Sequence, residues 1–265
     1  MKILVTGVCG QLGYDVMLEL MRRGHDVVGT DIGNCSAFKK YIQCDLTKMD
    51  EVEKLVKISK FDVVIHCAAW TAVDRAEDNK EIVYAINSLA AKYIAEAAKI
   101  VNAKIVYIST DYVFDGKGEK PFEVDSPKCG LSTYGRTKSI GEDFVIESNN
   151  RHFIVRTSGV FGKNGNNFVK TMLKIATSGK KEINVVNDQI VSVTYTKDLA
   201  FFIGNLIETE KYGIYHATNQ GYLSWYDFAK EIYSLSNIEM IVNGVSTEEY
   251  KKSVPGQTDR PKNSR

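Results

Sequence analysis

Tyr134 and Lys138 are the two side chains whose types and spacing most directly suggest chemistry in this 265-residue chain. They follow Ser132, a residue suited to begin a helix as its N-cap, and a spacing of four places both on one helix face. A phenol beside an ammonium can donate a proton at neutral pH, because the positive charge favours phenolate and lowers the tyrosine pKa from about 10. Both residue types are common, so the pair alone also describes an ordinary exposed helix face.

A glycine-rich turn near the N-terminus provides a place for a cofactor. Residues 2–6 form a predicted buried strand, and residues 7–13 carry glycines at Gly7, Gly10 and Gly13, before a helical apolar stripe that ends at Gly24. Glycines let the backbone approach a pyrophosphate, whose charge is stabilised by the helix N-terminus. The sequence therefore predicts a dinucleotide site at this turn.

Asp31 ends the second predicted strand, residues 26–30. Its carboxylate can accept hydrogen bonds from an adenosine ribose. It would also repel a 2′-phosphate, and this favours NADH over NADPH.

Strands and helices continue to alternate to residue 157, with strands predicted at 41–45, 62–69, 104–108 and 152–157, and helices at 47–59 and 79–101. Thr47 is the predicted cap of the first of these helices. The pattern predicts an α/β fold with a Rossmann-type, doubly wound parallel sheet. His66, inside an apolar strand, is interpreted as a core histidine. Asn87 interrupts an apolar helix stripe, as either a surface residue or a buried polar contact.

Two predicted strands end in residues that suit a ligand. Small residues, Ala68 and Ala69, end strand 62–69, which leaves room for a ligand across the strand end. Thr110 follows strand 104–108 at the edge where open parallel sheets bind ligands. It can hydrogen-bond a substrate oxygen there, or it can be an ordinary turn residue.

The alternation loosens beyond Thr157. We predict a helix at 168–177, a strand at 183–186, a helix capped by Thr196, a strand at 214–217 and a capping box that begins at Ser224. We interpret residues 1–157 as an NAD(P)-binding domain, completed by part of 183–217. Residues 158–265 are interpreted mainly as a smaller C-terminal domain that forms the substrate pocket.

Composition excludes several classes of protein. A net charge of +1 gives no general attraction to nucleic acid or to an anionic membrane. No apolar run approaches the length of a membrane span, and the N-terminus lacks a signal peptide. Five cysteines without a CxxC pair, and four histidines without ligand spacing, indicate reduced thiols in the cytoplasm and no metal site.

These motifs together resemble the extended short-chain dehydrogenase/reductase family over nearly the whole chain. The resemblance depends on the glycine turn, Cys67-Ala68-Ala69, Asn87, Ser109-Thr110 and the Tyr134/Lys138 pair. Finer features resemble the dTDP-4-dehydrorhamnose reductases within that family. The most specific is the octet Ser-Thr-Asp-Tyr-Val-Phe-Asp-Gly at residues 109–116, and others include Asp188-Gln189 and Arg260-Pro261.

The resemblance implies that NADPH or NADH reduces the 4-keto group of a nucleotide-linked 4-keto-6-deoxy sugar. Tyr134 would protonate the forming alkoxide, Lys138 would lower the tyrosine pKa and hold the nicotinamide ribose, and Thr110 would hydrogen-bond the keto oxygen. The implied cofactor-binding residues are Gly7, Gly10, Gln11, Leu12, Gly13, Asp31, Asp45, Leu46, Ala68, Ala69, Asn87, Tyr134 and Lys138. The implied substrate-binding residues are Thr71, Asp74, Tyr112, Asn167 and Arg260. The family also allows a homodimer and Mg²⁺ at a subunit contact, but no acidic cluster here demands a metal.

The chain departs from these reductases at several places. Gly159 stands where an aromatic residue is usual, which removes a ring that would pack on the sugar. Residues 190–194 lack the family's proline. The family normally continues into a terminal helix, so a C-terminally truncated chain is expected.

Three other functions compete with the reductase interpretation. A sugar-nucleotide 4,6-dehydratase needs a carboxylate base where this chain has Tyr112, so it is disfavoured. A 4-epimerase needs only the threonine, tyrosine and lysine, and it stays open. A non-catalytic subunit, such as the regulatory subunit of methionine adenosyltransferase, also shares the fold, although the intact Thr110, Tyr134 and Lys138 favour an enzyme.

Overall fold

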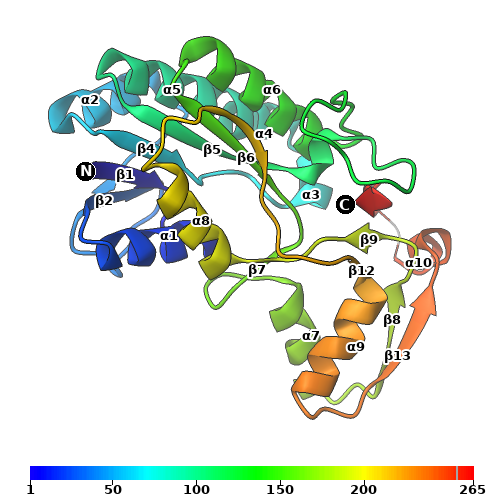
Figure 1. The fold of residues 1–265 in the computed structure, drawn as a ribbon. Helices are drawn as coiled ribbons and strands as arrows, with labels where there is room; N and C mark the ends of the chain where they lie inside the picture. Colours follow the sequence, from blue (N-terminus) through cyan, green and yellow to red (C-terminus); the bar gives the residue numbers. More distant parts are fainter. Residues whose placement is uncertain (255) are drawn as a thin grey trace.

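The computed structural model describes residues 1–254 and 256–265, apart from the side chain of Ile58. Its centre is a seven-stranded sheet in the order β11-β6-β5-β4-β1-β2-β3, and every neighbouring pair in it is parallel (Figure 1). The strands are β1 (Lys2–Thr6), β2 (Asp26–Asp31), β3 (Tyr41–Gln43), β4 (Val63–His66), β5 (Lys104–Thr110), β6 (His152–Thr157) and β11 (Gly213–His216). The predicted Rossmann-type parallel sheet is confirmed.

Helices cover both faces of this sheet, as a doubly wound fold requires. One face packs against α1 (Gln11–Arg22) and α8 (Thr196–Leu206), through core residues such as Val16 and Ile203. The other packs against α2 (Met49–Ser59), α5 (Ala90–Ile100) and α6 (Thr133–Ser148), through residues such as Val52 and Ile94. Because β1, β4 and β5 are apolar on both sides, they are buried between the two helix layers.

The predicted helix 79–101 is three consecutive segments. These are α4 (Lys80–Tyr84), a π-helical turn (Ala85–Leu89) and α5, preceded by the short α3 (Val73–Ala76). The π turn contains Asn87, whose side chain is buried. Single π turns inside α-helices occur frequently at functional sites.

A second, smaller group of elements lies beside the carboxyl ends of the large sheet (Figure 1). Helices α7 (Phe168–Thr177) and α9 (Trp225–Leu235) pack on the parallel pair β8 (Glu182–Val186) and β13 (Ile241–Val245) around a separate apolar core. The remaining elements are β7 (Val160–Phe161), β9 (Ile190–Val191), β10 (Thr194–Tyr195), β12 (Leu223–Ser224), α10 (Thr247–Ser253) and β14 (Asn263–Ser264). Strand β9 pairs with both β12 and β14, so the C-terminal segment joins this part of the molecule.

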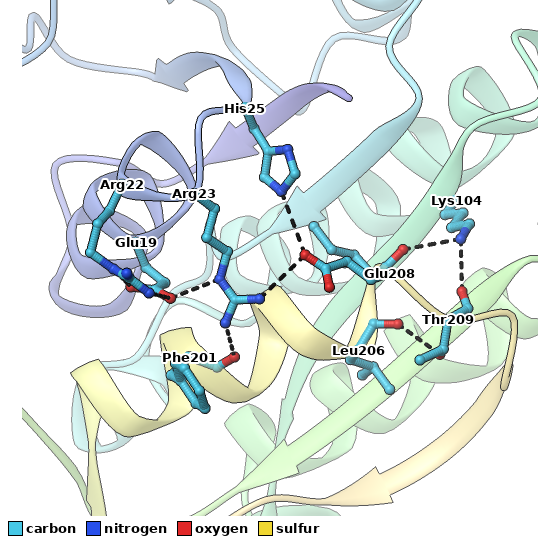
Figure 2. A network of polar contacts seen from close by, with 10 residues as sticks. Glu19, Arg22, Arg23, His25, Lys104, Phe201, Leu206, Glu208 and Thr209 are labelled. Atoms are coloured by element: carbon cyan, nitrogen blue, oxygen red, sulfur yellow. Dashed lines mark hydrogen bonds and ion pairs between the residues drawn. The ribbon is translucent and has the colours of Figure 1, made fainter.

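Helix α8 is fixed to α1 by a polar network at the end of the sheet remote from these strand ends (Figure 2). Arg23 donates to Glu19 of α1 at 2.7 Å and to the carbonyl of Phe201 in α8 at 2.9 Å. Glu208 lies 3.4 Å from Arg23 and 4.0 Å from His25. The network therefore attaches α8, which lies far along the chain, to the first helix of the same layer.

Some local predictions were wrong. Thr47 is not a helix cap, because its amide and hydroxyl both donate to Asp45 and α2 begins two residues later. Thr196 is not a cap either, because its hydroxyl donates to buried Asp15. The Ser224 capping box is confirmed. Strand β11 and α8 complete the large fold, whereas β8 lies outside it, and the division into two domains stays a prediction.

No helix among residues 1–254 and 256–265 combines the length and hydropathy needed to cross a membrane.

Candidate active site

Thr110 lies at the carboxyl edge of the large sheet, opposite Thr157 of the neighbouring strand. Its hydroxyl accepts a hydrogen bond from the Tyr112 amide at 3.2 Å and donates to Asp111 at 3.0 Å. These bonds turn the chain sharply after β5 and hold the hydroxyl at the strand end, where a ligand can reach it.

Tyr134 is carried to the same place by α6. Ser132 caps this helix, as predicted, by accepting from the Gly135 amide at 3.1 Å. The Glu77 carboxylate accepts from the Thr133 amide at 2.7 Å, which gives the helix a second anchor. Burial raises the pKa of the Tyr134 phenol well above its usual value, and the Thr110 hydroxyl beside it partly offsets this by favouring the phenolate. Tyr134 is therefore a firmly protonated phenol in contact with Thr110.

Lys138 is also buried, one turn further along α6. Its ammonium donates to the carbonyl of Ile108 at 2.6 Å and lies 3.9 Å from the centre of the Tyr107 ring. Burial lowers the pKa of Lys138 to about 7, although the Glu142 carboxylate opposes this. The prediction that Lys138 lowers the pKa of Tyr134 is wrong for this arrangement, because the ammonium is directed at the sheet and burial dominates the phenol.

A single large cavity connects this trio with the glycine turn. Its volume is about 1480 Å³, more than the roughly 300–1,000 Å³ of a typical pocket for one small molecule. Most of the predicted site residues line it, namely Gly7, Gly10, Gln11, Leu12, Asp31, Asp45, Leu46, Ala68, Ala69, Thr71, Thr110, Tyr112, Tyr134, Lys138, Asn167 and Arg260. Three predicted residues, Gly13, Asp74 and Asn87, do not line it.

The glycine turn fits a dinucleotide pyrophosphate. Gly7 has φ +68°, and a Cβ there would lie 2.7 Å from the Ala68 amide, so only glycine lets the turn pack this closely on the backbone at the end of β4. A Cβ on Gly13 would lie 2.2 Å from the Gly7 carbonyl, so this glycine lets α1 pack on the turn. Gly10 begins α1 with no side-chain cap, which leaves the helix N-terminus available to an anion. Asp31 accepts from the Cys9 amide at 3.0 Å and places a carboxylate at the far end of the cavity.

Asn87 is a buried polar contact, which decides between the two interpretations of this residue. It accepts from the Trp70 amide at 2.8 Å, and its amide group donates to the Trp70 carbonyl and to Thr137, both at 3.2 Å. It therefore joins the loop after β4 to the helix that carries Tyr134 and Lys138. Its effect on the site is to hold this loop and this helix in place.

The substrate side of the cavity is built from distant parts of the chain. Arg260 donates to Asp74 at 2.9 Å, and Tyr112 lies close enough to raise the arginine pKa. Asn167 caps α7 and donates to Gln11 at 2.7 Å, so it links the smaller group of elements to the glycine turn. Ser158 and Gly159 also line the cavity, and the hydroxyl of Ser158 was not singled out from the sequence. Nothing in its local pattern distinguished it from other serines.

Among residues 1–254 and 256–265, no group of three or more histidine, cysteine, aspartate or glutamate side chains could hold a metal ion. A role for Mg²⁺ at a subunit contact, and the homodimer itself, stay predictions.

The parallel sheet, the glycine turn and the Thr110, Tyr134 and Lys138 cluster at one cavity define a nicotinamide-dependent oxidoreductase of the Rossmann type. The family model described as "RmlD substrate binding domain" matches residues 1–265, and the chain belongs to this family. The resemblance inferred from the motifs is confirmed.

Relatives with full-length similarity support the same placement. The chain is 39% identical over 254 residues to the spore coat polysaccharide biosynthesis protein SpsK of Bacillus subtilis, covering 96% of this chain and 86% of that protein. It is 38% identical over 280 residues to dTDP-4-dehydrorhamnose reductase of Aggregatibacter actinomycetemcomitans, covering 99% and 89%.

Solved structures agree. The crystal structure of dTDP-4-dehydrorhamnose reductase from Bacillus anthracis in complex with NADP has a TM-score of 0.91 and 41% identity, covering 99% of this chain and 88% of that one. UDP-glucose 4-epimerase of Thermus thermophilus, in complex with NAD, has a TM-score of 0.84 at 19% identity, covering 100% and 90%, and this likeness shows the fold alone.

Proposed function

We propose that this protein reduces the 4-keto group of a nucleotide-linked 4-keto-6-deoxy sugar, and that its substrate is dTDP-4-dehydrorhamnose, reduced to dTDP-rhamnose. The observation that carries the proposal is the meeting of Thr110, Tyr134 and Lys138 at one cavity with the glycine turn. The full-length similarity to dTDP-4-dehydrorhamnose reductases supports the substrate.

Reduction needs a hydride donor and a proton donor, and a bound nicotinamide cofactor supplies the hydride. Gly7 and Gly10 would admit the pyrophosphate to the N-terminus of α1, and Asp31 would hold the adenosine ribose. Ala68 and Ala69 would leave room for the cofactor across the end of β4.

The chain's own residues complete the chemistry at the keto group. The Thr110 hydroxyl turns its one proton from Asp111 to the keto oxygen, where negative charge develops in the transition state. Tyr134 transfers its phenolic proton to that oxygen and becomes a phenolate. Lys138 holds the nicotinamide ribose. Tyr134 is well suited to hold this proton until it is needed, because burial raises its pKa.

The residues at the adenosine end of the cavity favour one of the two nicotinamide cofactors. Asp31 and Asp45 line this end, together with Cys9, Ile32, Cys44, Leu46 and Thr47, and no arginine or lysine of the described chain lines it with them. Asp45 has the Lys48 ammonium 3.7 Å away, whereas Asp31 has no ion-pair partner among the described residues, so a 2′-phosphate beside Asp31 would meet an uncompensated carboxylate and NADH is the preferred cofactor.

The reaction is tested by following NADH oxidation with dTDP-4-dehydrorhamnose. Sugar-dependent oxidation is expected, and its loss in Tyr134→Phe would support the assigned proton donor. A 4-epimerase would convert the sugar without consuming added NADH, and a regulatory subunit would bind NADH without turnover. Either of those results would overturn the proposed reaction.

The cofactor preference is tested separately with Asp31→Ser. This change should improve kcat/KM for NADPH relative to NADH by about tenfold or more, since like charges placed together cost several kcal/mol. Asp26→Ser, at the exposed start of the same strand, is the matched control and should leave the ratio unchanged. An unchanged ratio in Asp31→Ser would show that this carboxylate does not select the cofactor.

A further inference from the structure

Ser158 has a buried hydroxyl with an unmet hydrogen bond. The residue is 3% exposed, and among the described residues its Oγ has no partner at normal hydrogen-bond distance. Buried side-chain oxygens in folded proteins almost always have a partner. Ser158 also lines the cavity, so a ligand in the cavity can supply the missing bond.

The sheet register places this hydroxyl beside the reacting groups. Thr110 and Thr157 are paired across β5 and β6, so the next residues, Asp111 and Ser158, leave the two strands side by side. Burial raises the pKa of the Asp111 carboxyl, and the Ser158 hydroxyl opposes this from beyond normal hydrogen-bond distance. Asp111 accepts further bonds from Thr110 and from Ser264. Ser158 and Asp111 thus form a polar corner adjoining Thr110.

Gly159 lines the cavity next to Ser158. Its φ is +54°, a conformation that favours glycine. A Cβ there would lie 3.1 Å from the Val193 Cα and 3.0 Å from a methyl group of Val191, so neighbouring backbone resists a side chain. The cavity wall next to Ser158 is therefore main chain, where an aromatic ring was expected from the family.

We propose that the Ser158 hydroxyl, with the Asp111 carboxylate beside it, binds the hydroxyl on C3 of the sugar, the carbon next to the reacting carbonyl. The inference rests on the proposed function, because Thr110 and Tyr134 fix the carbonyl at C4. Of the two carbons bonded to C4 in a 4-keto-6-deoxy hexose, C3 carries a hydroxyl and C5 carries the methyl group. A hydroxyl can donate to Asp111 and accept from Ser158, whereas a methyl group can do neither.

The test crosses one substitution with one substrate change. Rates are measured for wild type and Ser158→Ala with dTDP-4-dehydrorhamnose and with its 3-deoxy analogue, using NADH. Ser158→Ala should lower kcat/KM for the 3-hydroxy sugar by about tenfold and leave the 3-deoxy sugar within twofold. Ser192→Ala is the matched control, a buried serine that does not line the cavity, and it should affect both sugars alike.

Equal losses on both sugars in Ser158→Ala, or no loss on either, would overturn the inference. Calorimetric binding of dTDP-rhamnose and its 3-deoxy analogue repeats the comparison without turnover, with the same selective weakening expected. Wild-type protein that binds these nucleotides but does not oxidise NADH refutes the proposed reaction, while the binding comparison still decides the role of Ser158. NADH affinity and thermal stability of each variant establish that it is folded.

Discussion

Replacing Glu142 should be the most damaging single change in the helix that carries the active site. Glu142 is fully buried and accepts from Arg156 twice, at 2.9 and 2.8 Å, and from Ser109. Burial alone would raise the pKa of Glu142, but its bonds to Arg156 and Ser109 outweigh burial and lower it. The carboxylate is thus charged and holds together α6, β6 and the strand end before Thr110.

The magnitude follows from what Glu142→Leu leaves behind. Arg156 is 4% exposed and would keep only the Val124 carbonyl at 2.9 Å and the face of the Phe114 ring. A buried charge that loses its partner costs about 3–5 kcal/mol. With total stabilities of about 5–15 kcal/mol, this is a large fraction of the free energy of unfolding.

Urea denaturation at pH 7 measures the effect. With a slope of about 2–3 kcal/mol per molar, the midpoint should fall by roughly 1–2.5 M. The double variant Glu142→Leu/Arg156→Leu should recover much of the loss, because it removes both charges together. Glu147→Gln, exposed on the same helix, should shift stability by no more than about 0.5 kcal/mol.

The reasoning is refuted if Glu142→Leu costs less than about 1 kcal/mol, or if the double variant loses the sum of the two single losses. Additive losses would mean that the two side chains stabilise the protein independently, despite their contact.

Three further predictions concern pH and helix capping. The kcat/KM of the free enzyme should fall as the pH rises through about 7, because Lys138 loses its proton there. In Lys138→Arg this alkaline fall should shift to higher pH, because the guanidinium stays charged. A fall at the same pH in the variant would assign it to another group. Burial lowers the pKa of His66 to about 3, below its value of about 6.5 in the unfolded chain. As the pH decreases below 6.5, the unfolded chain therefore binds a proton that the folded protein does not bind, and the free energy of unfolding decreases. His66 should account for about 2 kcal/mol of loss by pH 5, visible as a reduced pH slope of unfolding in His66→Gln, and an identical slope would contradict this. Ser224→Ala should cost about 1 kcal/mol by removing the α9 capping box, whereas Ser236→Ala at the other end should be near neutral in the same urea titration, and equal costs would argue against the cap.

Much of the fold was predictable because its signals are local. Burial on both faces requires the apolar runs of β1, β4 and β5. Close approach of the backbone requires the glycines of the first turn. The positions of Thr110 and Tyr134 followed from where a parallel sheet binds ligands.

The remainder depended on partners distant in the sequence. Thr196 has the residue type of a helix cap, but its hydroxyl donates to Asp15, which lies far earlier in the chain. The pairing of β8 with β13, across residues 182–245, left no local signal either. The direction of the Lys138 side chain depends on the Ile108 carbonyl and on burial, which sequence spacing cannot report. The sequence does not distinguish Ser158 either, because its significance depends on a buried hydroxyl that has no hydrogen-bond partner among the described residues.

The order of strands has a consequence for synthesis of the chain on the ribosome. Strand β11 is an edge of the large sheet and pairs with β6, which ends 56 residues earlier at Thr157. Until residues 213–216 emerge, the nascent protein has an unpaired apolar edge at β6, and α8 is missing from one face. Unpaired strand edges and uncovered apolar faces favour aggregation during translation. Ribosome-bound chains in which residue 157 but not residue 213 has left the exit tunnel should therefore recruit chaperones more strongly than chains stalled after residue 216 has left it.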